Sequence, residues 1–287
     1  MEFFWTNNFK ILMGQNGPMI SSEESGGISN NYTISEALAI PLPANLEHFG
    51  QIRVEYFDTN VLMFLNRISG LFKQELVVQL RINSNNADVI GNLWALLQDN
   101  IWGLVIDDAR SLALLRKHIS PSVLCDCPNL CKIKTTGLVP EMPNSDDANA
   151  SDRQALSKWL HRAQSGRPMA FKCATNLLGD EDDFSTDGLE EAFRQATTIP
   201  SIYILDFGEL TPAEEIIGRF PMHNSIGEQL NLIDEDGDSM FYTLERGPAD
   251  DRIGTVGEWN PGDLEDAEYN FLSLDIDVAR MGQFAQL

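Results

Sequence analysis

The stretch QIRVEYFDTNVLMFLNRISGLFKQELVVQLRI (51–82) alternates two runs rich in β-branched residues with one stripe of apolar residues at helical spacing. The runs QIRVEYF (51–57) and ELVVQLRI (75–82) have the composition of strands. Between them, apolar residues recur at the spacing that places them on one helix face. These residues are Val61, Phe64, Leu65, Ile68, Leu71 and Phe72. Strand, helix and strand in this order predict a right-handed βαβ unit with parallel strands.

The same alternation continues as far as Gly137. A second helical stripe, ADVIGNLWALLQD (87–99), precedes the strand-like run IWGLVID (101–107). The segments ARSLALLRKHIS (109–120) and NLCKIKTTG (129–137) repeat this order. A repeat of about 24 to 28 residues lies in the range of solenoid proteins. We therefore predict the α/β class, with repeated βα units and a mainly parallel, leucine-rich-repeat-like curved sheet.

Antiparallel β-hairpins are expected at both ends of this core. FKILM and PMISS flank the sequence GQNG (14–17), whose Asn-Gly pair suits a tight turn. At the other end, EQLNLI (228–233) and MFYTLE (240–245) flank a polar turn. Beyond Gly247 the sequence is rich in Gly, Pro and acidic residues.

These patterns divide the chain into three predicted regions. Residues 1–50 form the N-terminal hairpin and a connector, and residues 51–247 form one α/β domain. Residues 248–287 form an acidic, mobile tail, in which FLSLDIDVA (271–279) docks locally.

Charge and composition exclude several classes of partner. The net charge of −23 argues against nucleic acid and anionic membrane, because both require a positive face. No run reaches the ~18 apolar residues of a membrane span. The N-terminal residues lack the features of a secretory leader. Four cysteines are too few for a disulfide scaffold, so we predict a cytoplasmic or nuclear location.

Two groups of residues match part of a metal-binding motif, one of a calcium loop and one of a zinc knuckle, but neither motif is complete. Positions 1, 3, 5 and 12 of a calcium loop are matched by Asp234, Asp236, Asp238 and Glu245. Position 6 is Ser239, where that loop needs glycine, and strand-like flanks favour a hairpin turn. The cysteines are Cys125, Cys127, Cys131 and Cys173. They lack the second close cysteine pair of a zinc knuckle. Packing in the core is therefore the favoured role of these cysteines. We expect no metal and no other cofactor.

An α/β enzyme is the alternative to a non-enzymatic domain. Open sheets place ligands beyond the carboxyl ends of their strands. The candidates at such ends are Asp58, Asp107, Asp108 and Thr135. Helix capping is the favoured role for Asp58 and for Asp107 or Asp108. Motifs for a nucleophile elbow, a zinc protease or a phosphate loop are absent from the sequence, so we do not expect an enzyme.

Polar residues alternate with apolar ones along the predicted strands, and one set should face outward. Alternation places these residues together on the exposed face: Arg53, Glu55, Gln79, Arg81, Lys132 and Lys134. Four of the six are basic in a chain of net charge −23. We predict a local positive strip that contacts an acidic protein partner or the protein's own tail.

Several segments resemble a large group of nematode F-box proteins. LCDCPNLCKIKTTGLVPEMP (124–143) and ASDRQALSKWLH (150–161) resemble the Pro-rich loop of the group and its QAxxKWLH helix. DGLEEAFRQATTIPSIYIL (187–205) and NSIGEQLNL (224–232) resemble two further segments. The resemblance covers residues 3–247 and depends on the order and spacing of these segments.

The resemblance implies a non-enzymatic substrate-recognition domain of a cullin–RING ubiquitin ligase. Its partner would be a ligase substrate or subunit, and no catalytic residue is transferred. Family members carry an N-terminal F-box that docks to the adaptor subunit. This sequence departs from the pattern because no Leu- and Pro-rich helical module precedes Phe3. The acidic loop 179–187 and the segment after Gly247 also differ from the group.

Overall fold

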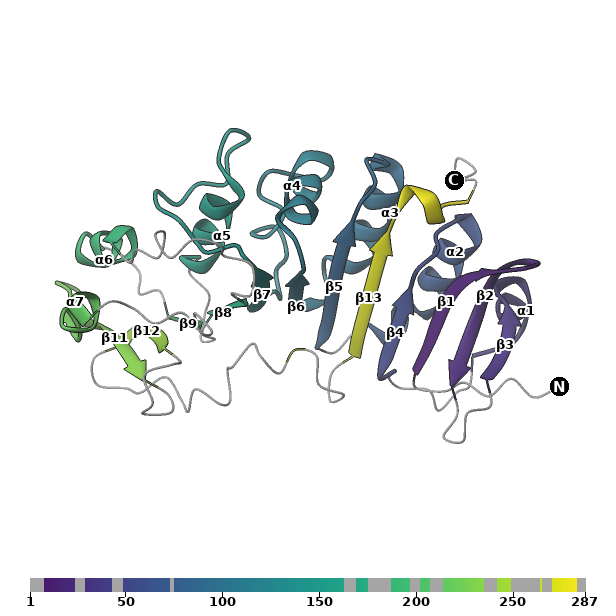
Figure 1. Ribbon diagram of the computed structural model, residues 1–287, viewed down its shortest axis with the longest axis horizontal. Coiled ribbons are helices and arrows are strands. Elements are labelled where there is room, and N and C mark those ends of the chain that lie inside the picture. Colours follow the sequence, from purple (N-terminus) through teal and green to yellow (C-terminus); the bar gives the residue numbers. More distant parts are fainter. Residues whose placement is uncertain are drawn as a thin grey trace. The chain divides into compact units, whose positions relative to one another are not determined.

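The computed structural model shows an α/β protein in which helices alternate with mainly parallel strands, as predicted (Figure 1). It describes residues 8–23, 29–42, 49–72, 75–162, 169–174, 187–196, 202–206, 214–234, 242–248, 264 and 270–282. The chain divides into two compact units. Unit 1 contains Met1–Ile119, Cys127–Leu130 and Leu264–Leu287. Unit 2 contains Ser120–Asp126 and Cys131–Asp263. The range predicted for the α/β domain, residues 51–247, includes parts of both units.

The sheet of unit 1 has the strand order β6-β5-β13-β4-β1-β2-β3. Its strands are β1 (Asn8–Gly14), β2 (Gly17–Glu23), β3 (Ser29–Thr33), β4 (Gln51–Val54), β5 (Leu76–Ile82), β6 (Ile101–Ile106) and β13 (Asn270–Ile276). Strands β1 to β3 pair antiparallel, and Gly14 is opposite Gly17 where β1 turns into β2. The pairs β1–β4, β4–β13, β13–β5 and β5–β6 are parallel.

The four α-helices of unit 1 that the structure describes begin at capping side chains, whereas the 3₁₀ turn η1 does not. Their bounds are α1 (Ile34–Ala39), α2 (Thr59–Ile68), η1 (Ser69–Leu71), α3 (Ala87–Leu97), α4 (Ala109–His118) and η3 (Val278–Arg280). The side chains of Asp58, Asn86 and Asp108 accept hydrogen bonds from the first turns of α2, α3 and α4. The apolar stripes of these helices are buried, as the periodicity predicts; Phe64 and Leu65 in α2 are fully buried.

The position of strand β13 differs from the prediction that residues 248–287 form a mobile tail. Residues 270–276 lie between β4 and β5 in the middle of the unit 1 sheet, parallel to both. Leu272 and Leu274 are completely or almost completely buried. The local docking predicted for residues 271–279 is therefore a central strand, and the description of residues 248–287 as a mobile tail is wrong for these residues.

Unit 2 has a mixed sheet with the strand order β10-β11-β12-β9-β8-β7. Its strands are β7 (Lys132–Thr136), β8 (Met169–Ala174), β9 (Tyr203–Asp206), β10 (Met222–His223), β11 (Glu228–Asp234) and β12 (Tyr242–Pro248). Strands β7, β8 and β9 are parallel, whereas β9–β12, β12–β11 and β11–β10 are antiparallel. Its helices are α5 (Asp152–Leu160), α6 (Asp187–Arg194) and α7 (Glu214–Ile217). Ser151 and Gln154 form the predicted capping box at the start of α5.

Helices long and apolar enough to cross a membrane do not occur among the residues that the structure describes.

Candidate functional site: a polar face on unit 1

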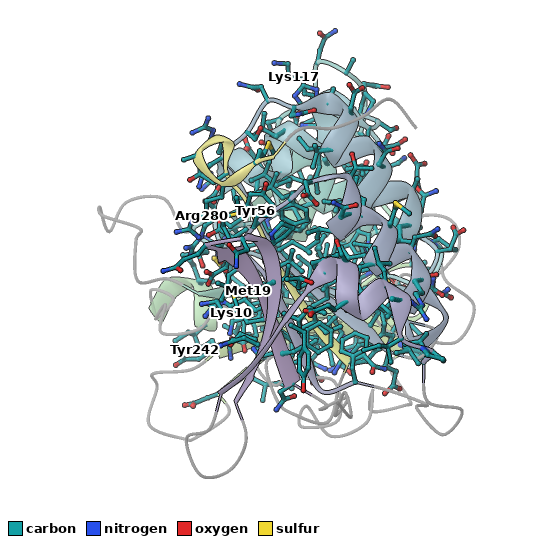
Figure 2. The ribbon with its side chains drawn as sticks, turned by 90° about the vertical axis from the view of Figure 1, so that its right-hand side faces the viewer. Lys10, Met19, Tyr56, Lys117, Tyr242 and Arg280 are labelled. Atoms are coloured by element: carbon teal, nitrogen blue, oxygen red, sulfur yellow. The ribbon has the colours of Figure 1, made fainter. Side chains whose placement is uncertain are left out.

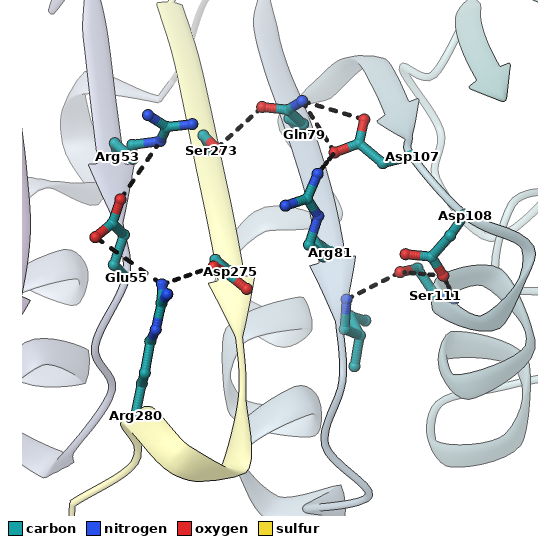
Figure 3. Close-up of polar contacts among 11 residues, drawn as sticks. Arg53, Glu55, Gln79, Arg81, Asp107, Asp108, Ser111, Ser273, Asp275 and Arg280 are labelled. Atoms are coloured by element: carbon teal, nitrogen blue, oxygen red, sulfur yellow. Dashed lines mark hydrogen bonds and ion pairs between the residues drawn. The ribbon is translucent and has the colours of Figure 1, made fainter. Parts of the chain in front are cut away.

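The unit 1 sheet carries helices α2, α3 and α4 on one face, and its other face bears rows of side chains across the strands (Figures 2 and 3). Residues paired in register point to the same side of a sheet. At the amino end of the parallel strands, Phe271 pairs with Val77, and Val77 pairs with Gly103. Leu264 is buried against Val77 and Phe271, and a Cβ atom at Gly103 would lie 2.7 Å from its Cδ2 atom. On β13, β5 and β6 this end of the face is therefore apolar and covered.

The half toward the carboxyl ends is polar. In the middle row, Lys10 pairs with Arg53, and Ser273 pairs with both Arg53 and Gln79. In the next row, Asp275 pairs with Arg81. We call the following residues the polar face: Lys10, Arg53, Glu55, Gln79, Arg81, Asp107, Ser273, Asp275 and Arg280.

The first half of the polar face is organised around Glu55. Its Oε1 atom lies 2.7 Å from Lys10 Nζ and 3.8 Å from Arg53 Nε. Arg280 follows β13 and places Nη1 2.9 Å from Asp275 Oδ2 and 3.9 Å from Glu55 Oε2 (Figure 3). Two carboxylates and three cations from β1, β4 and the end of β13 therefore form one continuous ionic network.

The second half is organised around Asp107, which directly follows β6. Gln79 Nε2 donates to Asp107 Oδ1 and Oδ2, both at 3.1 Å. Arg81 Nη2 donates to Asp107 Oδ2 at 3.3 Å. Ser273 Oγ donates to Gln79 Oε1 at 3.0 Å, which links β13 to this half (Figure 3). The polar face thus extends across β1, β4, β13, β5 and the end of β6.

Cationic and anionic side chains on this face differ in how much of each is exposed to solvent. The cationic side chains retain between 39% and 57% of their exposure; they are Lys10, Arg53, Arg81 and Arg280. The carboxylate side chains retain only 22% to 24%; they are Glu55, Asp107 and Asp275. The carboxylates are therefore less accessible to a ligand than the cationic side chains that they contact. Guanidinium groups in this arrangement suit carboxylate or phosphate ligands.

The six residues of the predicted strip are divided between the two units. Arg53, Glu55, Gln79 and Arg81 lie together on the polar face, but three carboxylates are interleaved, so the face is not uniformly positive. Lys132 belongs to unit 2 and is 2% exposed, so its predicted outward position is wrong.

Lys134 also belongs to unit 2, where it is partly buried and pairs in register with Lys172. Lys172 in turn contacts Asp206 at 2.7 Å. The alternation of residues along a strand could not reveal these differences, because burial depends on which elements cover each face of the sheet.

The residues proposed for the alternative enzyme have local structural roles. Asp58 Oδ1 accepts from Val61 N at 2.8 Å and caps α2. Thr135 Oγ1 donates to the carbonyl oxygen of Leu138 at 2.6 Å. Asp107 belongs to the polar face, and Asp108 caps α4. The contacts of Asp58, Asp108 and Thr135 are those of caps and turns, as the favoured interpretation of Asp58 and Asp108 predicted.

Substitution of Asp108 tests its assignment as a cap. Its Oδ1 atom accepts from Ser111 N at 2.8 Å and from Ser111 Oγ at 3.1 Å. Asp108→Ala should lower the free energy of unfolding by about 1 kcal/mol, measured by urea denaturation. Asp108→Asn keeps an oxygen acceptor and should lose much less. Equal losses in the two variants would contradict capping as the role of Asp108.

A second polar cluster, in unit 2, was not predicted. Arg246 and Glu228 are almost fully buried, and Arg246 Nη2 lies 2.7 Å from Glu228 Oε2. The guanidinium carbon of Arg246 lies 5.3 Å from the Phe193 ring centroid and 5.8 Å from that of Tyr203. Burial raises the pKa of Tyr203 to about 12.

His161 completes this cluster. Its ring centroid lies 5.3 Å from that of Tyr203, edge to face. Nδ1 is 2.8 Å from the carbonyl oxygen of Ser157, an acceptor, so Nδ1 carries the proton of the neutral ring. Part of the residue reaches the surface, but Nε2 is buried. Burial lowers the pKa of His161 to about 4, and the nearby Arg246 charge acts in the same direction.

Sequence reasoning missed the polar-face residues contributed by β13 and its C-terminal extension, Ser273, Asp275 and Arg280. A signal was present, because FLSLDI alternates apolar and polar residues like a strand with one buried face. The acidic composition around it outweighed that signal. Within the described ranges, no group of three or more His, Cys, Asp or Glu residues is placed to hold a metal ion. Residues 235–241, the middle of the segment that partly matches a calcium loop, lie outside those ranges.

Comparison of the chain with protein-family models and with curated proteins finds no match.

Proposed function

We propose that the chain is a non-enzymatic protein-interaction module that binds an acidic segment of a protein partner through the polar face. The arrangement of charge on that face carries the proposal. Arg53 and Arg81 are 57% and 56% exposed, whereas the carboxylates that they contact are less than half as exposed. An approaching partner therefore meets guanidinium donors first, and each guanidinium has N–H groups beyond those used in its ion pair.

The motif order in the sequence supports a more specific role. The segments that resemble nematode F-box proteins favour the substrate-recognition part of a cullin–RING ubiquitin ligase. In that role the bound protein is a ligase substrate or a ligase subunit. Leucine-rich-repeat-like proteins bind partners on the face lined by strands, and the polar face is formed by strands.

The net charge of −23 does not prevent an acidic partner from binding here. At physiological ionic strength, charges separated by more than about 8 Å are largely screened, so contact residues dominate the interaction. The overall negative charge should nevertheless slow association. We therefore expect binding that weakens with salt and depends on a few arginine contacts.

Charge reversal on the polar face tests the proposal. The double variant Arg53→Glu/Arg81→Glu should reduce capture of the partner at least tenfold, measured by quantitative mass spectrometry of proteins that co-purify with the tagged chain. The variant should remain folded, because exposed ion pairs contribute only about 0–1 kcal/mol each. Circular dichroism and the melting temperature check this.

The matched control is Arg110→Glu/Lys117→Glu, which changes the net charge equally. Arg110 and Lys117 are exposed on α4. Figure 2 shows Lys117 on the helical side of the sheet. This control should capture the same proteins as the wild type. Equal capture by the polar-face variant would refute the binding face. Recovery of a partner without adaptor or cullin would refute only the ligase role.

A further inference from the structure

Strand β13 is the last strand in the part of the chain that the structure describes, yet it lies between β4 and β5, which follow one another in unit 1. Strands β4 and β5 are joined through α2, and β13 separates them in the sheet. Four residues of β13 pair with β4, and all seven pair with β5, in parallel on both sides. Neighbouring strands lie about 4.8 Å apart, so β4 and β5 leave a slot one strand wide.

The slot holds its strand by hydrogen bonds at both ends. Phe271 N donates to the carbonyl oxygen of Gly50 at 2.9 Å, and Asn270 Oδ1 accepts from Phe49 N at 3.1 Å. At the other end, Asn83 N donates to the carbonyl oxygen of Ile276 at 2.8 Å. These contacts fix the register without depending on most of the side chains of the strand.

Side chains of β13 add selectivity on the two faces of the sheet. Leu272, Leu274 and Ile276 are 0–2% exposed on the helix-covered face. On the opposite face, Ser273 Oγ donates to Gln79, and Asp275 binds Arg280. A strand that fits this slot therefore needs apolar residues at three alternate positions and small polar or acidic residues between them.

We propose that the slot between β4 and β5 is a peptide-binding site, and that β13 is its tethered but replaceable ligand. The same strand supplied by a second copy of the chain can take its place. Removal of β13 also removes Ser273, Asp275 and Arg280 from the polar face. Occupancy of the slot thereby controls whether the polar face is complete.

The experiment uses the full chain, folded and then cut. A protease site is introduced at residues 255–256, between β12 and Leu264 in the sequence, so that cleavage after folding keeps every residue but removes the tether. The probe is a fluorescent peptide of residues 270–282. The control peptide carries Leu272→Asp and Leu274→Asp. Uptake is followed by fluorescence anisotropy over a urea series below the unfolding midpoint.

The cut protein should bind the probe saturably and release its own C-terminal fragment, detected by size exclusion and mass spectrometry. The uncut protein should bind at least tenfold less, because a tether supplies an effective concentration of about millimolar. The control peptide should not bind. If the cut protein keeps its own C-terminal fragment and binds no probe at any urea concentration, the proposal is overturned. Equal binding of the two peptides would do so as well.

Discussion

Replacement of Arg246 by methionine is expected to lower the free energy of unfolding by about 3–5 kcal/mol, because it leaves a buried carboxylate without its cation. Glu228 Oε2 accepts from Arg246 Nε at 3.1 Å and Nη2 at 2.7 Å, and both side chains are at most 3% exposed. Asn224 Nδ2 also donates to Glu228, at 2.7 Å, but brings no charge. Urea denaturation followed by circular dichroism measures the loss.

The double variant Arg246→Met/Glu228→Gln separates charge from packing. Glutamine keeps an acceptor for Asn224, but removes the buried charge. If the uncompensated carboxylate causes the loss, the double variant should recover most of the stability that the single variant loses, because replacing both partners of a buried pair is often nearly neutral. A double variant as unstable as Arg246→Met would instead assign the loss to packing against Phe193 and Tyr203.

The βα core was predictable from local sequence patterns. Helical stripes and β-branched runs determine which segments form α2 to α4 and β4 to β6, because each pattern depends only on neighbouring residues. Asp58 and Ser151 were recognisable as helix starts for the same reason. The order of these elements was enough to indicate a mainly parallel sheet.

The position of β13 was not predictable from local patterns. Its strand-like alternation is visible, but its partners Gln51 and Leu76 lie about 200 residues away in the sequence. Their proximity depends on non-local pairing, for which one sequence gives no direct signal. The predicted polar strip was therefore incomplete, because Ser273, Asp275 and Arg280 come from this segment.

The burial of the unit 2 cluster was also not predictable from local sequence patterns. Glu228 and Arg246 lie on neighbouring antiparallel strands, where charged residues usually face water. Here both side chains are enclosed, and the arginine packs on the rings of Phe193 and Tyr203. Which face of a strand is covered depends on helix packing that alternation cannot specify.

Acidification should destabilise the protein through His161. Its pKa in the folded protein is about 4, whereas an unperturbed histidine in the unfolded chain titrates near 6.5. Between these values the unfolded chain binds more protons, so stability falls as the pH falls. The contribution is complete above pH 6.5 and is lost progressively toward pH 4, by about 3 kcal/mol in total. Urea denaturation at a series of pH values between 7 and 4 measures this loss.

Carboxylates also gain protons between pH 7 and pH 4. The contribution of His161 is therefore measured by comparing variants with the wild type. His161→Asn keeps a donor near the position of Nδ1 for the Ser157 carbonyl oxygen, but does not titrate. Its unfolding free energy should decline less with acid than that of the wild type, by about 3 kcal/mol at pH 4. His223→Asn is the matched control, because it makes the same substitution at a histidine that is exposed on β10. If His161→Asn and the wild type show the same pH dependence, acid sensitivity arises elsewhere and the neutral ring beside Arg246 does not contribute to it.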